Sequence, residues 1–373
     1  MPEQGGGKDI IMKINLKKSM FSEKEYTLVS HGEMNVTAFK YSTGVEALKC
    51  SNKKGWFIIL PFQGQQIWKL HFDGRNLSMK TTIKEPVKTS EYLKTYGGFL
   101  YHCGINSFGV PDDKHPQHGE IPNAEYDEAY IICDEDADGK YISVGGHLNY
   151  DVAFTKKYRF SPECVMHENK SVLKINITLE NLRHEPMEYM YLCHMNFLPQ
   201  NGARLIYTAP RNKNYIKVHK IISDNTAEGK AKKIKAFMDK AQECPALCDE
   251  VGAKDEIYDP EICFAIKYLG DENGRGYTMQ YKEGEGACFV SHPTDILPVG
   301  VRWISRTADE DAMGMILPAT SEHLGYEDSK KKGYLKYLEP MGKLKFYIET
   351  GYLCEDDAKA IIRKCNDIMN SHK

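Results

Sequence analysis

The sequence predicts an all-β protein built as a large antiparallel sandwich. The first observation is a period of two in hydrophobicity: residues 171–180 (SVLKINITLE) alternate apolar and polar side chains, as a half-buried strand does. The second is that short runs rich in Val, Ile, Tyr and Phe recur along the chain, many of them separated by Gly, Asn, Asp or Pro. The third is that helices do not alternate with these strands, as they would in a protein with a parallel sheet.

The predicted strands are short, and they extend over most of the chain. Many short strands without intervening helices indicate antiparallel sheets that pack against each other. The predicted strands cover residues 26–30, 34–40, 56–60, 67–72, 141–149, 152–160, 171–180, 187–194, 262–268, 299–305, 313–317 and 344–350.

Two segments have helical spacing instead. Residues 230–242 place apolar side chains three and four positions apart, inside a polar stretch at 212–260 that reads as an insertion carrying one helix. Residues 355–370 form a C-terminal helix with one apolar stripe and three acidic residues in its first turn, where the helix dipole favours negative charge. Because no internal repeat or long linker occurs, residues 1–373 are predicted to form a single domain.

Composition excludes several classes of protein. With 41% hydrophobic residues in 373, the chain is too apolar to be disordered and can bury roughly three quarters of its unfolded surface. A net charge of -3 does not indicate a protein that binds nucleic acid. No apolar run reaches the ~18 residues of a membrane helix. The polar N-terminus argues against a signal peptide, and the 11 cysteines are scattered, so we expect reduced thiols in a cytoplasmic protein. Oligomeric state is not indicated.

The segment 97–130 concentrates glycine, proline and titratable side chains. Glycine and proline break regular structure, so the segment reads as a long irregular loop. Scaffolds often present chemistry on such loops, which makes this a candidate site; the alternative is a surface loop with incidental histidines. The candidate side chains are His102, His115, His118, Glu120, Asn123 and Glu125.

A second candidate lies at the end of an aromatic strand. His194 closes the run YMYLCH and is followed by Asn196. Histidine titrates near neutrality and can act as an acid or a base. The alternative reading is a histidine with satisfied hydrogen bonds in the core.

Four motifs, taken in order, resemble a known family. They are residues 63–75 (QGQQIWKLHFDGR), 118–123 (HGEIPN), 193–205 (CHMNFLPQNGARL) and 297–303 (LPVGVRW). Together they resemble the galactose mutarotase-like superfamily, and more closely its bacterial aldose 1-epimerase-like proteins that are often grouped as a domain of unknown function. The resemblance runs from about residue 30 to 353. It implies a β-supersandwich of two large antiparallel sheets, a few short helices, and a sugar-binding cleft across one sheet.

The resemblance also implies a chemistry, the interconversion of sugar anomers. A base removes the proton of the anomeric hydroxyl while an acid protonates the ring oxygen, so the ring opens and recloses on the other face. By position, His194 resembles the general acid and His118 the histidine that holds the sugar. Arg75 and Arg302 are candidates to hydrogen-bond hydroxyls, and Trp303 to stack on a sugar face. Further candidate sugar contacts are His102, Asn123 and Asn196.

One position departs from the family pattern. The glutamate that acts as the base in mutarotases is expected where this chain has Leu317, and a leucine cannot take a proton. Glu322 and Glu125 are the candidate replacements. Glu349 ranks below them, because it follows the turn at 338–343 that resembles the one after the family's base.

Two alternatives to an epimerase remain open. His115, His118, Glu120 and Glu125 offer nitrogen and oxygen ligands for a divalent metal, which would suit a metal-assisted sugar isomerase or lyase. The missing glutamate would also suit a non-catalytic carbohydrate-binding protein. The leading hypothesis is a carbohydrate isomerase without a cofactor, acting on a neutral monosaccharide or a glycoside-derived sugar by His/carboxylate acid–base chemistry.

Overall fold

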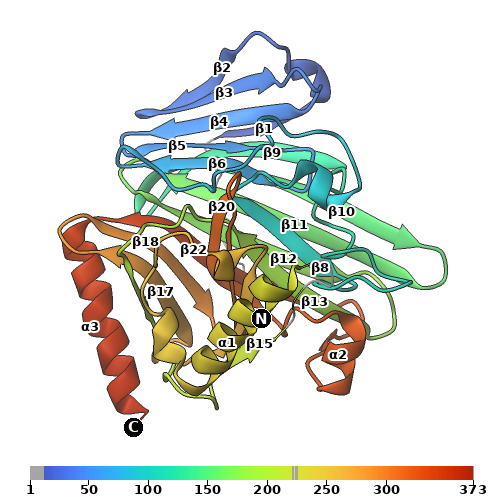
Figure 1. Ribbon diagram of the computed structural model, residues 1–373. Coiled ribbons are helices and arrows are strands. Elements are labelled where there is room, and N and C mark those ends of the chain that lie inside the picture. Colours follow the sequence, from blue (N-terminus) through green and yellow to red (C-terminus); the bar gives the residue numbers. More distant parts are fainter. Residues whose placement is uncertain (1–11, 221, 223–225, 373) are drawn as a thin grey trace, which may run out of the picture.

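Two large antiparallel sheets make up most of the molecule (Figure 1). The computed structural model describes residues 12–220, 222 and 226–372. The two sheets share one extensive hydrophobic core, to which strands of both contribute buried side chains. The predicted all-β supersandwich with a C-terminal helix is therefore confirmed.

The first sheet pairs strands from both halves of the chain. Within the described residues it has nine strands, and β22 lies between β12 and β18. Its order is β1 (Met12–Asn15), β9 (Glu128–Asp136), β10 (Gly139–Val152), β11 (Lys156–His167), β12 (Val172–Asn181), β22 (Lys343–Leu353), β18 (Gly286–Pro293), β17 (Arg275–Lys282) and β14 (Arg204–Tyr207).

The second sheet is larger and carries the candidate site. Thirteen strands can be followed in the part of the chain that the structure describes. Its main path is β15 (Ile216–His219), β16 (Ile262–Lys267), β19 (Val299–Arg306), β20 (Asp311–Ala319), β13 (Met187–Met195), β8 (Leu100–Ile105), β6 (Ile67–Phe72), β5 (Gly55–Ile59), β4 (Glu46–Asn52), β3 (Met34–Lys40) and β2 (Tyr26–His31), with β21 (Lys336–Leu338) beside β13 and β7 (Arg75–Asn76) beside β6.

Helices lie outside the sheets. Helix α1 (Glu228–Glu243) corresponds to the helix expected at 230–242, and the same polar stretch also supplies the edge strand β15. Helix α3 (Glu355–Ser371) packs its apolar stripe on β17 and β18 (Figure 1). Helix α2 (Tyr326–Lys331) is short, and 3-10 turns occur at Lys18–Met20, Tyr92–Thr95, Pro245–Cys248 and Glu256–Tyr258. No helix in the described residues is long and apolar enough to cross a membrane.

Two local predictions were wrong. The strand predicted at 152–160 spans the turn between β10 and β11, where Phe154 is 98% exposed and has a φ of 67°. The loop predicted at 97–130 contains β8, a central strand in which every residue is buried. Because both faces of β8 are covered, it lacks the alternation by which half-buried strands are recognised.

Replacing Phe160 by alanine should destabilise the fold strongly. Phe160 on β11 is fully buried and meets the His102 and Tyr191 rings of the other sheet, so its loss leaves a cavity between the sheets. We expect the free energy of unfolding in urea to fall by about 3–5 kcal/mol. Phe154→Gly, at the exposed positive-φ turn, should change it by less than about 1 kcal/mol. Equal losses for the two variants would contradict this account of the core.

Candidate functional site

A pocket of about 190 Å³ opens on the face of the thirteen-stranded sheet that points away from the other sheet. Its floor comes from neighbouring strands. Cys263 pairs with Trp303 across β16 and β19, and Val301 pairs with Leu317 across β19 and β20. Strand β13 adds Leu192 and His194, and the other lining residues come from four segments outside the strands, at 92–96, 109–118, 261 and 323.

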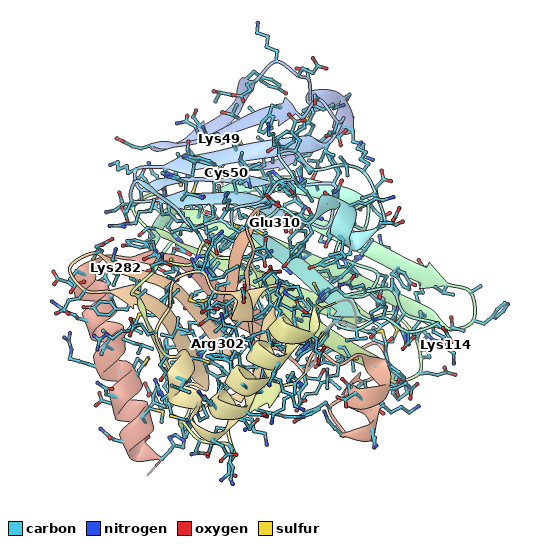
Figure 2. All side chains as sticks on the ribbon, viewed as in Figure 1. Lys49, Cys50, Lys114, Lys282, Arg302 and Glu310 are labelled. Atoms are coloured by element: carbon cyan, nitrogen blue, oxygen red, sulfur yellow. The ribbon has the colours of Figure 1, made fainter. Side chains whose placement is uncertain are left out.

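Strand alternation decides which predicted residues reach this pocket. Val301 and Trp303 line it, so Arg302 between them points to the opposite face of β19. There the Arg302 guanidinium lies 4.4 Å from the Tyr207 ring, within the body of the molecule (Figure 2). His102 likewise faces the nine-stranded sheet and shares a 2.7 Å hydrogen bond with the Tyr191 hydroxyl.

His118 reaches the pocket from the loop after β8. Its backbone has a φ of 61°, and its N–H donates to the Gly109 carbonyl at 3.1 Å. Its own carbonyl accepts from the Gly104 N–H at 3.0 Å. The His118 ring lies 5.2 Å from that of His194, at an interplanar angle of 83°. Its Nδ1 atom is buried and has no hydrogen-bond partner among the described residues.

His194 is enclosed by aromatic rings. The Trp303 ring lies 5.5 Å away and the Tyr96 ring 5.6 Å away, each roughly perpendicular to the imidazole. The Tyr96 hydroxyl donates to Asn196 Oδ1 at 2.9 Å, and Asn196 Nδ2 donates to the Gly98 carbonyl at 3.0 Å. Asn196 therefore lies beneath the pocket and holds Tyr96 rather than lining the pocket itself.

Three histidines of the pocket are held neutral. Burial lowers the pKa of His194 to about 3, although its hydrogen bond with Asn196 opposes the shift. Burial also lowers the pKa of His323, which follows β20, to about 3. Burial, His194 and His323 together hold the pKa of His118 well below its usual range. A neutral imidazole has one nitrogen that donates and one that accepts, so these rings can exchange protons with a bound hydroxyl.

Glu261 is a pocket residue that sequence reasoning missed. It precedes β16 and stands two positions before Cys263, so it shares the pocket face of that strand. Its Oε2 atom accepts a 2.6 Å hydrogen bond from Trp303 Nε1. It is the one carboxylate among the residues that line the pocket. Period two could have placed it beside Cys263, but the pairing of β16 with β19 was needed to bring it to Trp303.

Leu317 lines the pocket, with only 2% of its surface exposed. The position expected to hold the family's catalytic base therefore faces the site and is apolar. Neither predicted replacement takes its place in the lining. Glu322 is buried nearby and accepts hydrogen bonds from Lys217 and Lys332, each at 2.9 Å.

Glu125 and two other candidates lie farther from the pocket. Glu125 is exposed and forms an ion pair with Lys18 beside a different cavity. That cavity also holds Asn123, whose Oδ1 accepts from Gln66 Nε2 at 2.8 Å. Arg75 forms a 2.8 Å ion pair with Glu285 and is absent from the lining.

The predicted metal ligands do not converge. His115 contacts Asp112 at 2.9 Å, and Glu120 accepts from the Tyr158 hydroxyl at 2.5 Å. His118 faces the pocket, whereas Glu125 pairs with Lys18. The group of possible ligand atoms that does come together in the described part of the chain lies elsewhere, at Asp136, Asp138 and His167.

Solved structures share this fold. A crystal structure of a "putative aldose 1-epimerase" from Klebsiella pneumoniae superimposes with a TM-score of 0.75 at 18% identity, covering 96% of this chain and 91% of that one. A galactose mutarotase-like protein from Clostridium acetobutylicum gives a TM-score of 0.60 at 12% identity, covering 86% and 99%. A search of curated proteins finds no match to this chain.

The two-sheet architecture is thus the galactose mutarotase-like fold, as the sequence motifs indicated. Residues 42–351 match the family described as "Domain of unknown function (DUF4432)". Because that match covers most of the chain, the protein belongs to this family.

Replacing His194 by asparagine should make folding stability less sensitive to acid. Unfolded histidine takes up a proton below about pH 6.5, whereas buried His194 resists protonation down to about pH 3. Between these values the unfolded state binds more protons, so stability falls as pH falls, by up to about 1.4 kcal/mol per pH unit for each such histidine. Urea unfolding between pH 6.5 and 4.5 should show a shallower decline in His194→Asn. An unchanged slope, matching that of exposed His184→Asn, would contradict the buried neutral state.

Proposed function

We propose that this protein is a carbohydrate isomerase of the aldose 1-epimerase type that acts on a free sugar in the histidine pocket. The observation that carries the proposal is the pair of imidazoles at His118 and His194, 5.2 Å apart and nearly perpendicular, beside the Trp303 ring. One imidazole that gives a proton to the ring oxygen and a second that holds this oxygen, at different angles, suit a substrate whose ring opens and recloses.

The lining favours a neutral monosaccharide or glycoside-derived sugar. No lysine or arginine is among the lining residues, and the one carboxylate, Glu261, would repel an acidic or phosphorylated sugar. Trp303 and Tyr96 offer aromatic faces against which the C–H groups of a sugar ring can pack. The oxygen of Glu261 that Trp303 does not bond can accept a hydrogen bond from a sugar hydroxyl.

The proposed reaction moves two protons. A base takes the proton of the anomeric hydroxyl, and the C1–O1 bond becomes a carbonyl. The bond between C1 and the ring oxygen breaks, its electron pair goes to the ring oxygen, and that oxygen takes a proton from the acid. His194 is proposed as the acid: its neutral ring gives its N–H proton to the ring oxygen and regains a proton when the ring recloses. His118 is proposed as the group that holds and polarises the ring oxygen. After rotation about the C1–C2 bond the steps reverse on the other carbonyl face.

Non-catalytic sugar binding is the second candidate function. Leu317 favours it, because the position expected for the base is apolar and faces the pocket. On this alternative, the aromatic rings and neutral histidines would hold a sugar without opening its ring.

Anomer interconversion should be visible by proton NMR of freshly dissolved single anomers of neutral hexoses and pentoses. We expect the wild-type protein to speed equilibration of at least one sugar, and His194→Ala to slow it by about 100-fold or more. His167→Asn, a buried histidine on β11, should retain the wild-type rate. If no sugar equilibrates faster but a sugar quenches fluorescence in the wild type and not in Trp303→Phe, the non-catalytic alternative is correct.

A further inference from the structure

We propose that His323 is the base that takes the proton of the anomeric hydroxyl, that His219 behind it positions its ring, and that the charge of Glu322 supports it. This inference rests on the proposed function and deepens it. It assigns the base that Leu317 cannot supply. Glu322 is five residues beyond Leu317 in the chain, and its charge would act on the base rather than on the substrate.

His323 lies in the pocket wall on a fixed piece of backbone. Its carbonyl accepts from the Val110 N–H at 3.1 Å. Gly109, whose φ is 87°, packs so closely against it that a Cβ atom there would lie 2.0 Å from the His323 carbonyl oxygen. The ring lines the pocket, while its Nδ1 atom is buried without a partner among the described residues. One side of the imidazole thus faces the pocket and the other faces the protein interior.

His219 lies directly behind this ring. It ends β15, where it pairs with Cys263 of β16, so its side chain shares the sheet face that carries the pocket. The rings of His219 and His323 are 4.6 Å apart at 79°. His219 is 5% exposed, and its buried Nε2 atom lies 3.5 Å from Glu322 Oε2.

Glu322 ends the chain of groups with a buried negative charge. Burial raises the pKa of Glu322, but hydrogen bonds from Lys217 and Lys332 outweigh burial, and the net pKa is lowered. The carboxylate is therefore ionised at neutral pH. Glu322 lines a neighbouring cavity with Lys217, whereas the next residue, His323, lines the sugar pocket. Glu322, His219 and His323 thus lie in succession, and the ionised carboxylate stands close behind the candidate site.

This arrangement gives His323 a support that His118 lacks, a carboxylate charge that favours its protonated form. When His323 takes a proton, the nearby negative charge of Glu322 stabilises the protonated ring. His118, by contrast, faces His194 and His323, which disfavour its protonated form. Glu261 has one oxygen bonded to Trp303 and is exposed, so it lacks a comparable support.

The charged groups around His323 allow a test of the proposed base, because removing a negative charge and removing a positive charge should change its pKa in opposite directions. Burial and His219 lower the pKa of His323, Glu322 raises it, and His194 and Lys332 lower it further. Asp328, which Lys332 also contacts at 2.7 Å, and Lys217 complete the charged groups around Glu322 and His219. Removing Glu322 should weaken the base, and removing Lys332 should strengthen it.

The experiment compares kcat, KM and pH profiles for anomer interconversion in purified full-length variants. His323→Asn should lose about 100-fold or more in kcat. Glu322→Gln should lose about 10- to 100-fold in kcat, with KM changed less than about threefold. The acid limb of the pH profile of its kcat should move to lower pH. Lys332→Gln should keep the wild-type kcat, and the acid limb of its pH profile should move to higher pH. A merely structural role would lower kcat in both charge variants.

Glu46→Gln is the matched control. Glu46 is also a buried carboxylate with two lysine partners, Lys40 and Lys88, but it has no contact with the histidines. It should lose similar stability and keep wild-type kinetics. If His323→Asn stays active while Glu261→Gln does not, the base is Glu261 and the inference is wrong. An inactive wild-type protein would remove the proposed function itself, and the base assignment with it.

Discussion

The site depends on the backbone register between β15, β16, β19 and β20 in the larger sheet. Hydrogen bonds between these strands place Cys263 opposite His219 and Trp303, and Leu317 opposite Val301. A slip of one residue in any pair would turn these side chains to the other face. The core face is filled by large side chains, which makes such a slip costly. Packing between the sheets therefore fixes what the outer face presents.

Burial then sets the electrostatics of that face. The imidazoles sit among aromatic and aliphatic side chains, and burial is the largest influence on the pKa of each. They are neutral not because a partner fixes them but because charge is costly in this environment. A bound sugar would remove remaining water from the pocket, so the few nearby charges would act on the imidazoles more strongly.

The sequence predicted the architecture better than the site. Period two in β12 and helical spacing in α3 were directly readable, because each element buries one face. Strand β8 was missed because it is buried on both faces. For the site, motif position led to His118, His194 and Trp303. It could not exclude Arg302, because only the sheet register shows that its side chain points away. Glu261 and His219 lie in no motif, and they reach the site through strand pairing alone.

Leu317 has a wider consequence for how such a fold can change. Its neighbours in the pocket come from three other strands, β13, β16 and β19, and from loop segments on several sides. The scaffold can therefore exchange the side chain at this point without rebuilding the backbone. On the proposed function, the proton acceptor then stands at another position in the same pocket. Shared topology between distant relatives then says little about which residue performs the chemistry.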